Sequence, residues 1–100
     1  MTALGVRASS ADIIARLDML AAELNTHGWA ASVQAPHGGM PRLYARNPEP
    51  RAAALSESIY AQPRTDGTWS YWWPWAEPIA DTAAAAAAVI VRVLRPAAAR

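Results

Sequence analysis

The first regular pattern in the chain is helical. Four aliphatic side chains recur at spacings of four, three and four residues: Ile13, Leu17, Leu20 and Leu24. This spacing places them along one face of an α-helix. Ser9 offers a hydroxyl cap before the segment, and Gly28 offers a left-handed stop after it. We therefore predict a helix over residues 10–27.

Four later segments alternate between apolar and polar residues, which is the period of a β-strand with two different faces. The alternation predicts strands over 29–35, 42–47, 55–62 and 68–73. Glu57 is a flaw in the third strand because it falls on the apolar side, where a strand end or a bulge has to absorb it. Asp66-Gly67 favours a tight hairpin between the last two strands, and Pro74 ends the fourth.

An alanine-rich segment near the end of the chain predicts a second helix. It starts at Asp81 or Thr82 and runs to Arg95, and Asp81 is the preferred candidate for its cap. Small alanine side chains would let this helix approach the sheet closely, opposite the bulky tryptophans.

The element order is therefore α-β-β-β-β-α. Consecutive strands with short connections indicate an antiparallel four-stranded meander, and two helices indicate one covered face. The sequence predicts an α+β fold, a two-layer α/β sandwich with both helices on one face. We expect a single domain over residues 9–96, a flexible N-terminal arm at 1–8 and a frayed C-terminus at 97–100.

Alternation also assigns the aromatic side chains to two faces. Four of them are expected beneath the helices as a structural core: Trp29, Trp69, Tyr71 and Trp73. The chain has five Trp and no Phe, so Trp is its large residue for filling a small core. Trp75 lies past the fourth strand, where we expect it to cover one edge of the core.

The opposite, open face of the predicted sheet collects residue types that are enriched at protein interfaces: Arg42, Tyr44, Arg46, Tyr60 and Trp72. Serine and glutamine surround these side chains and tolerate either water or a partner. A solvated face is the plainer interpretation, but the combination of Arg, Tyr and Trp favours an interaction face.

Composition excludes several function classes. The chain of 100 residues has no Cys, so it can form neither disulfides nor thiolate metal sites. Its net charge of +1 is too small for a polyanion binder driven by counterion release. Neither a transmembrane run nor a secretory signal is visible, so we expect a cytoplasmic protein.

Candidate catalytic residues are few. His27 is the last residue of the first predicted helix, where an imidazole suits the negative end of the helix dipole. His37 lies in a glycine-rich loop, and the chain lacks the Gly-x-Ser-x-Gly elbow that such a loop accompanies in esterases. The acidic residues show no paired spacing, which also argues against a metal site. We therefore expect no enzymatic activity, no cofactor and no metal.

The interaction face leaves several partners open. A second copy of the chain is the simplest, because twofold homodimers are the commonest assemblies and a thin core invites one. Another protein comes next. Single-stranded nucleic acid is the rival of a different class, since aromatic rings flanked by Arg resemble a stacking platform, although the near-neutral charge makes it unlikely. A small apolar ligand at the Trp cluster is a third alternative.

Residues 66–79, with Asn47-Pro48 and residues 55–60 upstream, resemble a group of small Trp-rich proteins of high-GC bacteria that are often encoded near helix-turn-helix regulators. The resemblance covers nearly the whole length. It implies an accessory or regulatory interaction protein, and it transfers no catalytic or ligand residues. The element order is also similar to that of the small α/β chaperones of secretion systems, which are dimers, but this is a likeness of fold alone.

Overall fold

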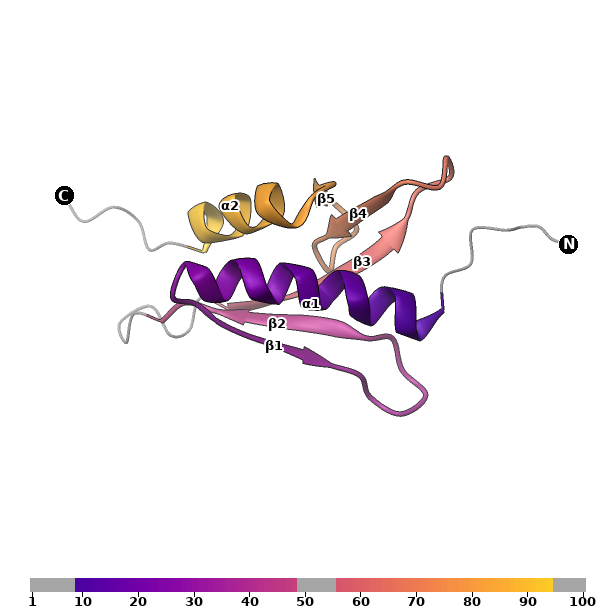
Figure 1. Cartoon of the computed structure of the whole chain (residues 1–100), viewed down its shortest axis with the longest axis horizontal. Helices are drawn as coiled ribbons and strands as arrows, with labels where there is room; N and C mark the ends of the chain where they lie inside the picture. Colours follow the sequence, from indigo (N-terminus) through magenta and orange to yellow (C-terminus); the bar gives the residue numbers. More distant parts are fainter. Residues whose placement is uncertain (1–8, 49–55, 95–100) are drawn as a thin grey trace, which may run out of the picture.

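A computed structural model describes residues 9–48 and 56–94. The element order is α1 (Ser10–Thr26), β1 (Ala30–Gln34), β2 (Arg42–Arg46), β3 (Ser56–Pro63), β4 (Trp69–Trp72), β5 (Pro78–Ala80) and α2 (Ala83–Val93). The strands form one antiparallel sheet in the order β1-β2-β3-β4-β5, with the helices packed against it (Figure 1). The α+β class is confirmed. The expected arm at 1–8 and frayed end at 97–100 lie outside the described residues.

The first helix begins and ends where its local sequence predicts. The Ser9 hydroxyl accepts a hydrogen bond from the backbone N–H of Asp12 at 3.1 Å, so it caps a helix N–H that has no partner within the helix. At the other end Gly28 takes a φ of 81°, and its N–H donates to the carbonyl of Asn25 at 2.9 Å. A left-handed glycine after the last turn is the usual way in which a helix stops.

The β3–β4 hairpin is also confirmed. Gly67 has a φ of 89°, which a residue with a Cβ adopts only under strain. The Asp66 carboxylate accepts from both the N–H and the hydroxyl of Thr68, at 3.0 and 2.6 Å. These two bonds hold the pKa of Asp66 below its ordinary value, since they favour the charged form. Two turn-forming residues thus set the register of the strands that carry the aromatic side chains.

The prediction of four strands was wrong, because a fifth follows the Pro74 turn. β5 is three residues long and begins at Pro78, which has no N–H to give to a ladder. It still pairs with β4 through Tyr71–Ala80 and Trp72–Pro78, with a shift of register between the two pairs. Proline is tolerated at the start of a short edge strand. Proline is also a turn signal, and the sequence prediction therefore missed this strand.

The second helix differs from the prediction in its cap and in its neighbours. Its cap is Thr82, whose hydroxyl accepts from the N–H of Ala85 at 3.2 Å, whereas Asp81 is bound elsewhere. α1 contacts β1, β2 and β3, whereas α2 packs against α1 and β5. The buried face of α2 consists of Ala86, Ala87 and Ile90, so its alanines allow a close approach to these neighbours.

One core cluster joins both helices to the sheet. Its large side chains come from both helices, from β2, β3 and β4, and from the residues just outside β1, β4 and α2: Ile13, Leu17, Leu20, Leu24, Trp29, Leu43, Ile59, Tyr71, Trp73, Ile90 and Leu94. At its edge the Asn47 side-chain amide is buried and donates to the carbonyl of Leu94 at 2.8 Å. This bond ties the segment after β2 to the end of α2.

Candidate functional site

Strand register places the predicted interaction face on the side of the sheet away from α1. Leu43, Ala45, Ile59 and Ala61 are fully buried toward the helices, and the residues that alternate with them therefore point the other way. Tyr44 pairs with Ser58, Arg46 with Ser56, and Tyr60 with Trp72. The structure thus brings Arg42, Tyr44, Arg46, Tyr60 and Trp72 onto the open face, defined here as the side of β1–β4 that faces away from α1.

Two of these residues help to line a pocket, named here the aromatic pocket. Its volume is about 340 Å³, and it lies where β3 and β4 meet the β1–β2 loop and the β4–β5 turn: Met40, Tyr60, Gln62, Trp72, Trp73, Pro74 and Ala76. Met40 is half exposed, and its sulfur accepts a hydrogen bond from the Gln62 amide at 3.2 Å. Sequence reasoning missed Met40, although it alternates in step with Arg42 and so belongs to the same face.

Trp72 lies between the pocket and a charged neighbour. The Arg64 guanidinium carbon is 5.8 Å from the centroid of its ring, within the range of a cation–π interaction. The indole Nε1 is buried, and no described residue accepts its hydrogen bond. A buried donor without an acceptor destabilises the free chain by about 1–3 kcal/mol. The exposed edge of this indole is therefore not a simple solvated surface.

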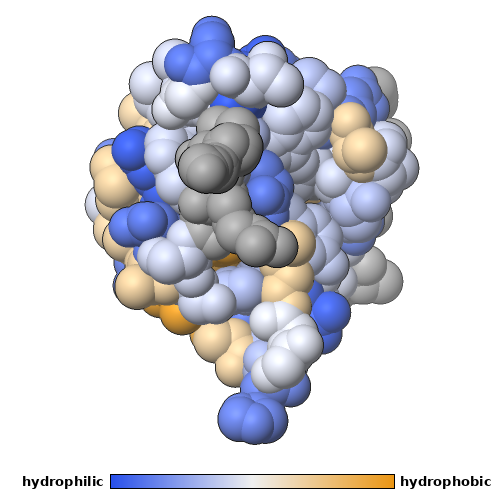
Figure 2. All heavy atoms as spheres, turned by 90° about the vertical axis from the view of Figure 1, so that its right-hand side faces the viewer, coloured by the Kyte–Doolittle hydropathy of each residue, from blue (hydrophilic) through white to orange (hydrophobic). Residues whose placement is uncertain are grey.

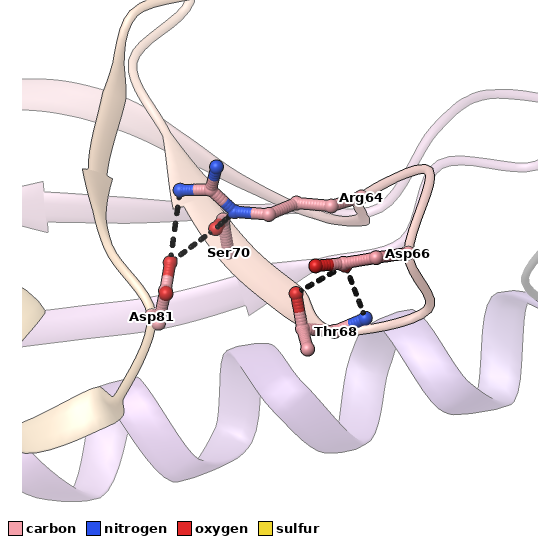
Figure 3. A network of polar contacts seen from close by, with 5 residues as sticks. All are labelled: Arg64, Asp66, Thr68, Ser70 and Asp81. Carbon is pink, nitrogen blue, oxygen red and sulfur yellow. Dashed lines mark hydrogen bonds and ion pairs between the residues drawn. The ribbon is translucent and has the colours of Figure 1, made fainter.

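A polar network fixes the strand that carries Trp72 (Figure 3). The Ser70 hydroxyl is buried and donates to the Asp81 carboxylate, while Arg64 donates both to Ser70 and, at 3.0 Å, to Asp81. The bond from Ser70 and then the charge of Arg64 hold the pKa of Asp81 below its ordinary value. The network links the β3–β4 hairpin to Asp81, the residue that follows β5, and its hydroxyl is enclosed by the chain.

The arginines and tyrosine on β2 remain accessible. Arg42 donates to the side-chain oxygen of Gln34 at 3.3 Å, and the Tyr44 hydroxyl bonds to the Ser56 hydroxyl at 2.7 Å. Arg46 is exposed on the same face. Figure 2 views the molecule from the right of Figure 1, and among the described residues drawn there, beige and orange atoms form small separate patches in a surface that is mostly pale or blue.

The predicted structural core divides into three buried residues and one at the edge. Trp29, Tyr71 and Trp73 are buried. Trp69 is partly buried on the helix side, where the Arg16 guanidinium carbon lies 5.0 Å from its ring centroid. These two residues border a second pocket of about 590 Å³ together with Asp12, Ala15 and Met19 of α1.

Trp75 was expected to cover an edge of the core, and it contacts the core through one buried ring. Its side chain is 58% exposed and stacks on Trp73 with ring centroids 5.3 Å apart and planes 6° apart. Its Nε1 donates to the Glu77 carboxylate at 2.8 Å. Ala76, next along the turn, has a φ of 69°, a left-handed conformation that is uncommon for a residue with a Cβ.

The described residues contain no group of three or more His, Asp or Glu side chains that could hold a metal ion. Within the same ranges, neither helix has the length and apolar character needed to cross a membrane. Comparison with protein-family models, with curated proteins and with solved structures finds no match to this chain. Functional inference therefore rests on the geometry of the open face.

Proposed function

We propose that this chain is a cytoplasmic, non-enzymatic protein-interaction module that binds its partner through the open face. The observation that carries the proposal is the aromatic pocket, because it joins two predicted interaction residues, Tyr60 and Trp72, to the exposed Met40. At protein interfaces a few residues supply most of the binding energy, and these residues lie in well-packed pockets that exclude water and are rich in Trp, Tyr and Arg. Polar hydroxyl groups on the rest of the face can meet the rim of a partner.

The state of Trp72 supports this proposal over a solvated face. Its ring is only partly buried and lines the aromatic pocket, so an apolar side chain of a partner can contact it there. Arg64, Ser70 and Asp81 hold the surrounding strand in place. A site held rigid before binding loses less conformational entropy when its partner docks.

A selection experiment that starts from random peptides tests the proposal. Twelve-residue peptides displayed on phage are selected on the immobilised chain, and the selected peptides are then measured against two matched variants. Met40→Ser changes the pocket, whereas Met19→Ser makes the same change on α1 at nearly equal exposure, 52% against 51%. We expect Met40→Ser to weaken binding about tenfold and Met19→Ser to leave it unchanged.

Two outcomes would overturn the proposed function. One is that no peptide is enriched on the chain. The other is that the selected peptides bind the Met40→Ser variant as well as they bind the unmodified chain. Far-UV circular dichroism of both variants checks that the fold is retained, which we expect since both methionines are half exposed.

A further inference from the structure

The open face carries positive charge without matching negative charge. Arg42 and Arg46 are exposed on β2, and Arg64 lies over Trp72. Among the described residues only Arg64 of these three forms an ion pair, with Asp81. None of the described open-face positions of β1–β4 holds a carboxylate. A partner that covers this face must therefore bring negative charge or leave two guanidinium groups without a counter-charge.

The two exposed arginines lie in line with the aromatic pocket. Arg42 and Arg46 are four residues apart on one strand, so they point the same way with about 13 Å between their backbone positions. Met40, at the pocket, precedes Arg42 by two residues along the same chain direction. Met40, Arg42 and Arg46 thus follow one line along β2, and the rest of the pocket lies beside the start of this line, on β3, β4 and the β4–β5 turn. A partner in extended conformation matches such a line, because its alternate side chains reach the same surface.

We propose that the partner presents an extended acidic segment of a different protein. One apolar side chain of that segment occupies the aromatic pocket, and carboxylates about four residues apart bind Arg42 and Arg46. The planar guanidinium group favours this pairing, since it can donate two parallel hydrogen bonds to one carboxylate. The inference rests on the proposed function, because it uses the same face, and it adds the chemistry of the partner.

Charge distinguishes this partner from a second copy of the chain. A twofold contact would place the open face against itself, so Arg42 and Arg46 would meet a face whose described β1–β4 positions hold no carboxylate to pair with them. Nucleic acid also carries negative charge, but the face offers it only two arginines without an ion-pair partner. Two phosphate contacts give little counterion release.

Defined peptides test the inference by fluorescence anisotropy. The probe is a labelled twelve-residue peptide with one Leu as anchor and two Asp residues four positions apart, in a Ser/Gly background. A second probe replaces both Asp with Asn. We expect the Asp peptide to bind at least about tenfold more tightly than the Asn peptide, and Arg42→Gln and Arg46→Gln each to weaken its binding about fivefold.

Arg92→Gln is the matched control, because Arg92 is exposed on α2, away from the open face, and its loss changes the net charge equally. It should leave binding unchanged. Equal binding of the two peptides, or equal weakening by Arg92→Gln and Arg46→Gln, would overturn the acidic partner. Tighter and strongly salt-dependent binding of a fifteen-nucleotide oligothymidine would also overturn it, because that result favours nucleic acid as the partner. A dimer in light scattering that Met40→Ser dissociates would overturn it as well, because that result favours a second copy of the chain.

Failure of this inference is distinct from failure of the proposed function. If library peptides depend on Met40 but are neutral or basic, the open face binds a protein and only the acidic chemistry is wrong. If no library peptide depends on Met40, both proposals fail together.

Discussion

The Tyr71 hydroxyl donates a hydrogen bond of 2.7 Å to the backbone carbonyl of Arg16 in α1. This contact holds the Tyr71 side chain on the side of β4 that faces α1. Because successive strand residues point to opposite faces, Tyr71 on the helix side places Trp72 on the open side. The side of β4 that carries Trp72 is therefore opposite to the side on which Tyr71 bonds to α1.

Replacement of Tyr71 by Phe removes this bond and leaves the Arg16 carbonyl without its donor. We expect the free energy of unfolding, measured by urea titration at pH 7, to fall by about 1–2 kcal/mol. Burial raises the pKa of Tyr71 above its ordinary value of 10.0, with the Arg16 charge opposing this shift. The folded state therefore favours the neutral phenol, and its contribution is complete below pH 10 and declines as the pH rises through the folded pKa.

The Tyr71→Phe variant also tests the direction of this pH dependence. The difference in stability between the chain and Tyr71→Phe should be greatest at pH 7–9 and should shrink above pH 10. A difference that grows above pH 10 would mean that Tyr71 does not face α1 in a buried setting.

Asp81→Ala should destabilise the chain at neutral pH, because Ser70 and Arg64 then lose their shared acceptor. The pKa of Asp81 is held below 3.8, first by the Ser70 hydroxyl and then by Arg64. A lowered pKa in the folded state stabilises the fold above the unfolded pKa and stops doing so as the pH falls through the folded value. Urea midpoints should therefore differ at pH 7 and converge toward pH 2. A constant difference across this range would contradict the ionic part of the network.

The two stacked indoles should differ sharply in their effect on stability. Trp73 is 5% exposed and lies in the core, so Trp73→Ala should cost about 3–5 kcal/mol and unfold most of the chain. Trp75 is mostly exposed, so Trp75→Ala should cost less than about 1 kcal/mol. Circular dichroism melts check both values. Equal destabilisation by the two variants would show that Trp75 contributes as much to the stability of the core as Trp73 does.

Ala76→Gly should stabilise the chain by about 0.5–1 kcal/mol. Ala76 has a φ of 69°, a left-handed conformation in which its Cβ is strained and glycine is not. Ala61→Gly is the matched control, since Ala61 is buried in β3 and its replacement should destabilise the chain. A loss of stability in both variants would rule out strain at the β4–β5 turn.

The sequence predicts those parts of the fold that are determined by local periodicity. α1 follows from its apolar spacing, Ser9 and Gly28, all within one short segment. The assignment of Tyr60 and Trp72 to one face follows from alternation, which any regular strand obeys. Helical spacing and strand alternation together predict the α+β class and the residues of the open face.

Other features depend on contacts between distant residues. β5 has three residues and starts with Pro78, so neither its period nor its composition indicates a strand. The bond between Ser70 and Asp81 joins residues 11 positions apart and exists only because β5 returns beside β4. The β4–β5 turn contains the left-handed Ala76, and alanine gives no sequence signal for this conformation. The aromatic pocket includes residues of the β4–β5 turn, so local sequence patterns do not predict it.

The central claim is that the pocket at Trp72 is where a partner binds, and indole NMR tests it most directly. Each of the five Trp side chains gives its own Nε1–H signal in a ¹⁵N-labelled chain. On titration with a peptide selected from the library, the Trp72 signal should shift most and the signal of the buried Trp29 should stay in place. A shift confined to Trp69, with Trp72 unchanged, would move the binding site to α1 and contradict the account.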